Sequence, residues 1–155
     1  MVAAATASAV LNADEARLVQ TAWAAVKNSE VDILYAVFKA NPDIQARFPK
    51  FVGKDLDSVK GSADFALHAA RIVSFFTDFI NLVGNDANTP ALDTLLRQLA
   101  SDHKNRGVTT EQISRFTDTL TGFVSSHAPW GDNVAAAWAK GSEANLALVR
   151  SVIDG

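Results

Sequence analysis

The sequence has 155 residues, no cysteine and a formal net charge of -3 at pH 7, and 48% of its residues are hydrophobic. A chain of this length forms one domain with a sizeable core. The slight acidity argues against nucleic acid or an anionic membrane as the main partner, and the lack of cysteine excludes disulfides and thiol chemistry. Asp, Asn, Arg or His interrupts each apolar run before it reaches the roughly 20 residues that a membrane-spanning helix needs. We therefore expect a soluble single-domain protein.

The chain begins with an uncharged, Ala-rich stretch. We expect residues 1–12 to form a flexible arm and residues 13–155 to form the single domain. The arm has the small apolar residues of a secretory signal but lacks the basic residue at its start. Asn12 is followed three residues later by Glu15, which is the spacing of a capping box, and apolar residues then recur at helical spacing up to residue 26. The first helix is expected to begin after Asn12.

Helix signals continue in the next third of the chain. A second helix is expected over residues 29–40. Asn41 as a cap and Pro42 at the first helical position then predict a short third helix, which ends near Phe48 because the next residue is proline. A loop is expected from there to Gly61.

Four further helices are predicted in the rest of the chain. The most hydrophobic stretch covers residues 62–83 and ends at the sequence GNDANTP. Thr89 begins the next helix, Thr109 with Gln112 three residues later begins another, and Asp132 begins the last. No segment alternates apolar and polar residues as a half-buried β-strand does. The sequence therefore predicts an all-α domain of seven or eight helices.

Two of the three histidines lie on strongly apolar helix faces. His68 stands in DFALHAARI, and His103 follows Leu99 by four residues and Leu96 by seven. A buried imidazole without a hydrogen-bond partner costs roughly 1–3 kcal/mol, so each ring is expected to have a use. A single histidine of this kind is usually a core residue bonded to a backbone carbonyl. Two of them on successive long helices can instead hold a flat, apolar, metal-centred group between them.

Several kinds of site can be compared with this pair of histidines. Tetrahedral zinc needs three or four protein ligands, and no Cys, Asp or Glu accompanies either histidine at ligand spacing on the apolar face. No Ser, Thr or Lys recurs beside them in a nucleophile-and-base arrangement. A haem needs one strong axial ligand from the protein and a slot lined by Phe, Leu, Ile and Val, which this chain offers.

Three segments, taken in order, resemble those of the globin family, and most closely the haemoglobins of midge larvae. ILYAVFKANPDIQARFPKF resembles the second globin helix and the proline-initiated third helix, GKDLDSVKGSADFALHAARIVSFF resembles the segment of the distal histidine, and LASDHKNRGVT resembles the proximal segment. The resemblance covers nearly the whole chain. It implies the globin fold, with seven to eight helices around a pocket for haem b, iron protoporphyrin IX.

The resemblance also implies roles for individual residues. His103 takes the position of the proximal ligand to the haem iron, and His68 takes that of the distal histidine. The remaining distal positions fall on Leu34, Arg71 and Ile72. The haem-contacting positions fall on Phe48, Phe51, Leu99, Val108, Ile113 and Phe116.

The chemistry of a haem site sets requirements for these side chains. The proximal imidazole must be neutral, so its second nitrogen is expected to donate to an acceptor, for which the carbonyl of Leu99 one turn earlier is the natural candidate. On the distal side, His68 can donate a hydrogen bond to dioxygen. Arg71 follows three residues later and has two alternative positions: outside, paired with a haem propionate, or inside, bonded to the ligand together with or instead of His68.

The resemblance implies reversible dioxygen binding for oxygen transport or storage, without enzymatic activity, and with CO and NO as further ligands. It also implies an extracellular location in haemolymph, with the cytoplasm as the alternative, and either a monomer or a homodimer. The rival function is a haem enzyme that uses the same pocket, a nitric-oxide dioxygenase or a peroxidase. Such an enzyme needs an electron supply, and the sequence has no glycine-rich dinucleotide fingerprint.

Overall fold

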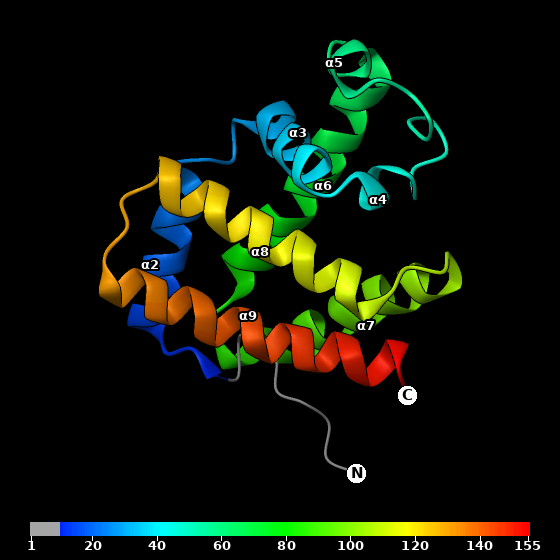
Figure 1. Cartoon of the computed structure of the whole chain (residues 1–155). Helices are drawn as coiled ribbons and strands as arrows, with labels where there is room; N and C mark the ends of the chain where they lie inside the picture. The colour runs from blue at the N-terminus through cyan, green and yellow to red at the C-terminus, as the bar shows by residue number, and fades with distance from the viewer. Residues whose placement is uncertain (1–9) are drawn as a thin grey trace.

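The computed structural model describes residues 10–155, so residues 1–9 of the expected arm lie outside its described part. Residues 13–153 form eight α-helices and one 3-10 turn, without a β-strand, which confirms the all-α prediction (Figure 1). In chain order these are α2 Ala13–Ala24, α3 Glu30–Ala40, α4 Pro42–Gln45, α5 Leu56–Val59, α6 Ala63–Leu82, η1 Asp86–Asn88, α7 Thr89–Asn105, α8 Thr110–His127 and α9 Asp132–Ile153. Among the described residues no helix is long and apolar enough to cross a membrane.

The first helix begins with the capping box that the sequence predicts. The side chain of Asn12 accepts from the backbone N–H of Glu15 at 2.8 Å, and the Glu15 carboxylate accepts from the backbone N–H of Asn12 at 3.0 Å. Leu11, which belongs to the predicted arm, is only 5% exposed and packs in the core. A second predicted capping box, between Thr109 and Gln112, begins α8. Both pairs satisfy backbone N–H groups that a helix start leaves without partners.

Three local predictions differ from the structure. The short third helix, expected to end near Phe48, ends at Gln45. The loop expected before Gly61 contains the one-turn helix α5, which Asp55 caps by accepting from the backbone N–H of Ser58. Asn41 precedes α4 as expected, but its side chain makes no capping bond. Its amide instead donates to the carbonyl of Val37 and to the hydroxyl of Thr119, each at 3.0 Å. Asn41 therefore joins α3 to α8 across the molecule.

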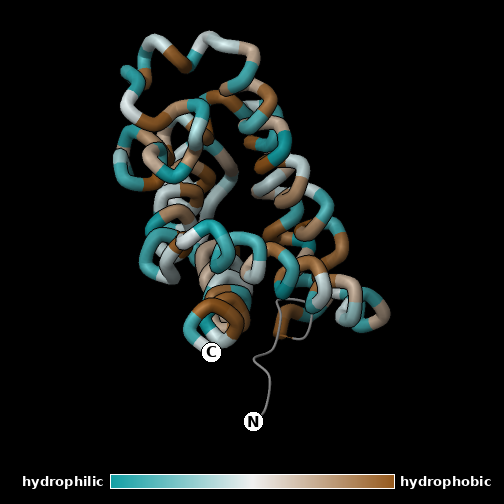
Figure 2. Tube along the Cα trace, turned by 90° about the vertical axis from the view of Figure 1, so that its right-hand side faces the viewer, coloured by the Kyte–Doolittle hydropathy of each residue, from teal (hydrophilic) through white to brown (hydrophobic). Residues whose placement is uncertain are grey.

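The apolar side chains form two packed clusters. The larger one joins α2, the second half of α6, α7, α8 and α9, and it contains Trp23 and Trp138. The smaller one joins α3, α4, α5 and the first half of α6, which lie in the upper part of Figure 1. Phe116 of α8 packs against both clusters. Figure 2 shows hydrophobic and hydrophilic residues interleaved along the helices, as amphipathic helices require.

The corner after α6 is packed closely against α2. Gly84 has a φ of +91°, and a β-carbon at this residue would lie 2.3 Å from the β-carbon of Ala16. Gln20 of α2 donates from its amide to the carbonyls of Ile80 and Val83, at 3.1 and 3.3 Å. The backbone conformation and the close approach therefore both require glycine at position 84.

Candidate functional site

His68 lies on α6, among aromatic rings that come from the segment between α4 and α5. The rings of Phe48 and Phe51 meet the imidazole edge-on, with centroid separations of 5.7 and 5.3 Å and interplanar angles of 88° and 78°. Phe51 is 1% exposed, whereas Phe48 and His68 are half-buried. The two phenylalanines thus limit the positions that the imidazole can take, while one side of it stays open.

The surroundings of His68 favour its neutral form. Burial lowers the pKa of His68 below its ordinary value of 6.5, the positive charges of Arg71 and Lys50 lower it further, and Asp64 opposes them. A neutral imidazole has one N–H donor and one nitrogen lone pair. His68 can therefore donate a single hydrogen bond at neutral pH.

The other predicted distal residues take three different positions around His68. Leu34 of α3 is 1% exposed and belongs to the small apolar cluster. Ile72, one turn after His68, is half-buried and packs against the same cluster. Arg71 is exposed and forms no ion pair with another described residue. Its guanidinium is therefore available either to a group at the rim or to one within reach of His68.

His103 lies in the last turn of α7 and makes the hydrogen bond that the sequence predicts. Its Nδ1 is 2.7 Å from the carbonyl oxygen of Leu99. A carbonyl only accepts, so Nδ1 is the donor of this bond and Nε2 takes no part in it. His127 at the end of α8 makes the same kind of bond to the carbonyl of Phe123, at 2.8 Å, but its ring is exposed and stacked on Phe123. This bond fixes the orientation of an imidazole in both cases. The residues around the imidazole determine which group its Nε2 can bind.

The remaining predicted contact residues are apolar and incompletely covered. Leu99, Val108, Ile113 and Phe116 are all half-buried. Leu95, two turns before His103, is 36% exposed and is one of the large apolar side chains most accessible to solvent. Phe116 is held from behind by a parallel stack on Phe76, with ring centroids 6.0 Å apart. Apolar surface of this kind is stabilised when a flat apolar group covers it.

The two histidine-bearing helices do not pack closely together. α6 packs mainly on α3 and α2 and comes near α7 far less, while α7 packs mainly on α9. The side chains of α6 and α7 therefore cover one another little. The imidazole of His103 with its Nε2 outside the helix bond, the neutral imidazole of His68 and half-buried apolar side chains are the groups that a haem requires of a protein. The residues present therefore fit a haem.

Sequence reasoning missed part of the surroundings of His68. Phe38 of α3 lies 4.9 Å from the ring of Phe48 and 6.1 Å from that of Phe51, and Phe65 lies 5.5 Å from Phe51. These rings form the wall behind the two phenylalanines that touch His68. Phe38 and Phe65 lie on the apolar faces of their helices, so the sequence predicts their burial. It does not predict their contacts with Phe48 and Phe51.

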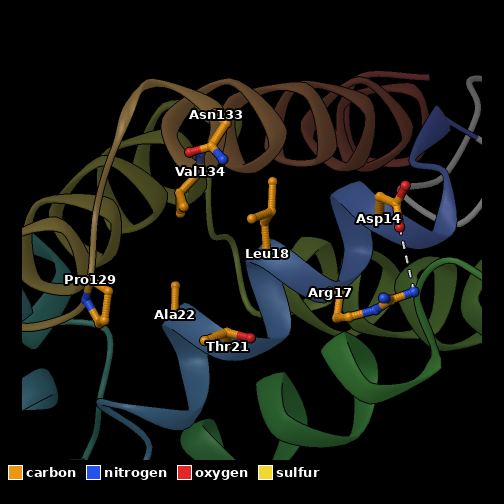
Figure 3. A pocket seen from close by; sticks show the side chains of 8 residues that line it. All are labelled: Asp14, Arg17, Leu18, Thr21, Ala22, Pro129, Asn133 and Val134. Atoms are coloured by element: carbon orange, nitrogen blue, oxygen red, sulfur yellow. Dashed lines mark hydrogen bonds and ion pairs between the residues drawn. The ribbon is translucent and has the colours of Figure 1, made fainter.

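Other parts of the structure offer less for binding chemistry. A cavity of about 520 Å³ lies between α2 and the start of α9, and none of the predicted site residues lines it (Figure 3). Its lining includes apolar side chains such as Leu18 and Val134 and the exposed ion pair of Asp14 with Arg17, at 3.5 Å. No group of three His, Asp or Glu side chains within residues 10–155 is placed to hold a metal ion.

Comparisons with known proteins identify the family of the chain. Residues 31–145 match the family model described as Globin. Globin CTT-Z of Chironomus thummi piger is 58% identical over 83% of this chain and 78% of that protein, and globin CTT-V of the same organism is 54% identical over 92% and 88%. The crystal structure of haemoglobin component TA-VII from Tokunagayusurika akamusi is similar with a TM-score of 0.84 at 41% identity, covering 93% of this chain and 94% of that one. The chain belongs to the globin family.

Proposed function

We propose that this globin holds haem b between α6 and α7 and uses it to bind dioxygen reversibly, for oxygen transport or storage. The observation that carries the proposal is the pair of histidines on these helices. His103 has Nδ1 fixed on the Leu99 carbonyl, and His68 is neutral between two phenylalanines. The haem supplies a ferrous iron that binds diatomic gases, which are dioxygen, CO and NO.

On the proximal side, His103 would hold the iron through Nε2. The bond from Nδ1 to Leu99 fixes the tautomer and the ring orientation, and the end of α7 sets the position of the ring. Leu99, Val108, Ile113 and Phe116 would supply apolar contacts to the haem on this side. They would exclude water, which favours the ferrous state that oxygen binding needs.

On the distal side, the single N–H of His68 would donate a hydrogen bond to a bound diatomic ligand. Phe48 and Phe51 hold the imidazole, and with Leu34 and Ile72 they form the apolar wall around the ligand. The exposed position of Arg71 favours a place at the rim, paired with a haem propionate.

Oxygen carriage is preferred here to enzymatic use of the same site. Nitric-oxide dioxygenase and peroxidase activities need a supply of electrons, whereas a carrier needs only a protected ligand site. One of the similar proteins is named a haemoglobin component, which supports the carrier. An extracellular location and a monomeric or dimeric state are parts of the same proposal, made by family resemblance.

The experiment that tests this function is absorption spectroscopy of three haem-loaded proteins: the parent, His103→Ala and His127→Ala. The parent and His127→Ala are expected to give an oxygenated spectrum that lasts for hours in air. His103→Ala is expected to lose it and to regain a histidine-like spectrum when imidazole is added. His127 is the matched control because it makes the same bond to its own helix. Rapid oxidation of the parent, or an unchanged spectrum in His103→Ala, would count against the proposal.

A further inference from the structure

Gln45, the last residue of α4, is a buried polar side chain that neither the capping patterns nor the haem contacts explain. It is 9% exposed. Its amide nitrogen donates to the carbonyl of Phe51 at 3.0 Å and to that of Lys54 at 2.9 Å. A glutamine amide has two N–H donors, so these two bonds use both.

The two carbonyls belong to the irregular segment between α4 and α5. This segment is built from successive turns, in which the carbonyl of Phe48 accepts from the N–H groups of Phe51 and Val52, and that of Phe51 accepts from Lys54. Gly53 has a φ of +73°. Such a chain of turns has no helix or sheet to hold it. The two hydrogen bonds of the Gln45 side chain therefore stabilise the conformation of this segment on its buried side.

The outer side of the segment is held far more weakly. Lys50 pairs with Asp64 at the start of α6, at 3.2 Å, but both side chains are more than half exposed. Exposed ion pairs of this kind contribute little. The buried bonds of Gln45 are the stronger constraint.

Gln45 itself stands on a firmly held helix. Arg115 of α8 forms a bidentate ion pair with Asp43, and the side-chain amide of Gln112 donates to the same carboxylate at 3.2 Å. Arg115 also donates to Asn41 at 3.2 Å. These bonds fix α4 relative to α8. Through Gln45, α4 in turn holds the segment that carries Phe48 and Phe51.

We propose that Gln45 is a positioning residue of the distal site: by holding the carbonyls of Phe51 and Lys54, it fixes the phenylalanine rings that restrain His68. It touches neither the ligand nor the imidazole and acts through Phe48 and Phe51. The inference rests on the proposed function for its effect on oxygen binding. Its structural core, the coupling of Gln45 to the orientation of His68, is a property of this chain alone.

The test compares Gln45→Met with Gln20→Met in the full, haem-loaded protein. Methionine keeps the length and volume of glutamine but has no N–H donor. Gln20 is the matched control because it also donates to two loop carbonyls, those of Ile80 and Val83, at a corner that does not touch His68. Both variants are expected to lower the melting temperature. If Gln45→Met does not fold, Gln45→Glu is measured in its place.

Three readouts separate positioning from simple loss of stability. In the carbon monoxide complex, Gln45→Met is expected to shift or broaden the C–O stretching band and to weaken the nuclear Overhauser effect between the rings of Phe51 and His68. Its oxygen dissociation rate is expected to rise by on the order of threefold to tenfold. Gln20→Met is expected to leave all three unchanged.

The outcomes distinguish this inference from the proposed function. If both variants change the three readouts equally, or neither does, Gln45 has only a structural role and the inference is overturned. If the parent does not bind haem and carbon monoxide at all, the proposed function fails, and the nuclear Overhauser effect between the rings of Phe51 and His68, measured in the protein without haem, then decides the inference alone. A normal parent with an unaltered Gln45→Met overturns the inference alone.

Discussion

Replacement of His68 by leucine tests the distal half of the site. Leucine is close to histidine in size and suits the apolar surroundings, so the wall formed by Phe48 and Phe51 is expected to remain in place. What the variant loses is the single N–H of a neutral imidazole. The low pKa of His68 matters here, because it keeps the ring neutral and held among the phenylalanines at pH 7.

The size of the effect follows from the bond that is removed. A hydrogen bond to a ligand with partial negative charge contributes roughly 1.5–3 kcal/mol, and each 1.4 kcal/mol corresponds to a factor of ten. The oxygen dissociation rate of His68→Leu is therefore expected to rise by roughly one to two orders of magnitude. Carbon monoxide carries less negative charge, so its dissociation rate is expected to change much less.

Stopped-flow displacement of oxygen by carbon monoxide measures the rate directly. His68→Gln is the control, because it keeps an N–H donor at this position and is expected to lie between the parent and His68→Leu. An oxygen dissociation rate within about twofold of the parent, in a His68→Leu protein with a normal haem spectrum, would refute the assignment of His68 as the main donor.

Three further substitutions test other parts of the account. Arg71→Ala removes a positive charge near His68 and is expected to raise the pKa of that imidazole, which NMR titration measures; an unchanged oxygen dissociation rate in the same variant would place Arg71 outside the pocket. Asp43→Asn removes the partner of Arg115, which holds the pKa of Asp43 well below its ordinary value of 3.8. The ionised carboxylate is more favoured in the folded chain, so its stabilisation is present above pH 3.8 and is lost as the pH falls below it. Melting temperatures measured against pH should therefore converge for the parent and Asp43→Asn in acid, and curves that stay parallel would contradict this. Gly84→Ala is expected to lower the free energy of unfolding by about 1–3 kcal/mol from its positive φ alone, and urea denaturation that shows no loss would be evidence against the tight corner.

The helix starts show how far local sequence carries a prediction. Asn12 and Thr109 satisfy their own helix ends through residues three positions away, so the pattern contains all the information needed. Asn41 looked like a similar cap, but its amide reaches Thr119, 78 positions away in the sequence. The helix α5 was missed because a single turn has little intrinsic stability and depends on the burial of Val59.

The same contrast applies to the site. The bond from His103 to the Leu99 carbonyl spans one helical turn, so once the resemblance had marked His103, the acceptor could be named from the sequence. The contacts of His68 with Phe48 and Phe51 join different elements, so the family resemblance was needed to bring those residues together. Gln45 was not predicted, because nothing in the sequence shows that a polar residue in a short helix will be buried against a loop.

The central claim is that His103 alone ligates the haem iron and that His68 stays free for the ligand. The absorption spectrum of the reduced haem protein without oxygen or carbon monoxide tests it most directly. We expect the spectrum of five-coordinate ferrous haem, because the rings of Phe48 and Phe51 restrain the imidazole of His68. A six-coordinate spectrum with two histidine ligands, or a spectrum that is the same in His103→Ala, would contradict the account.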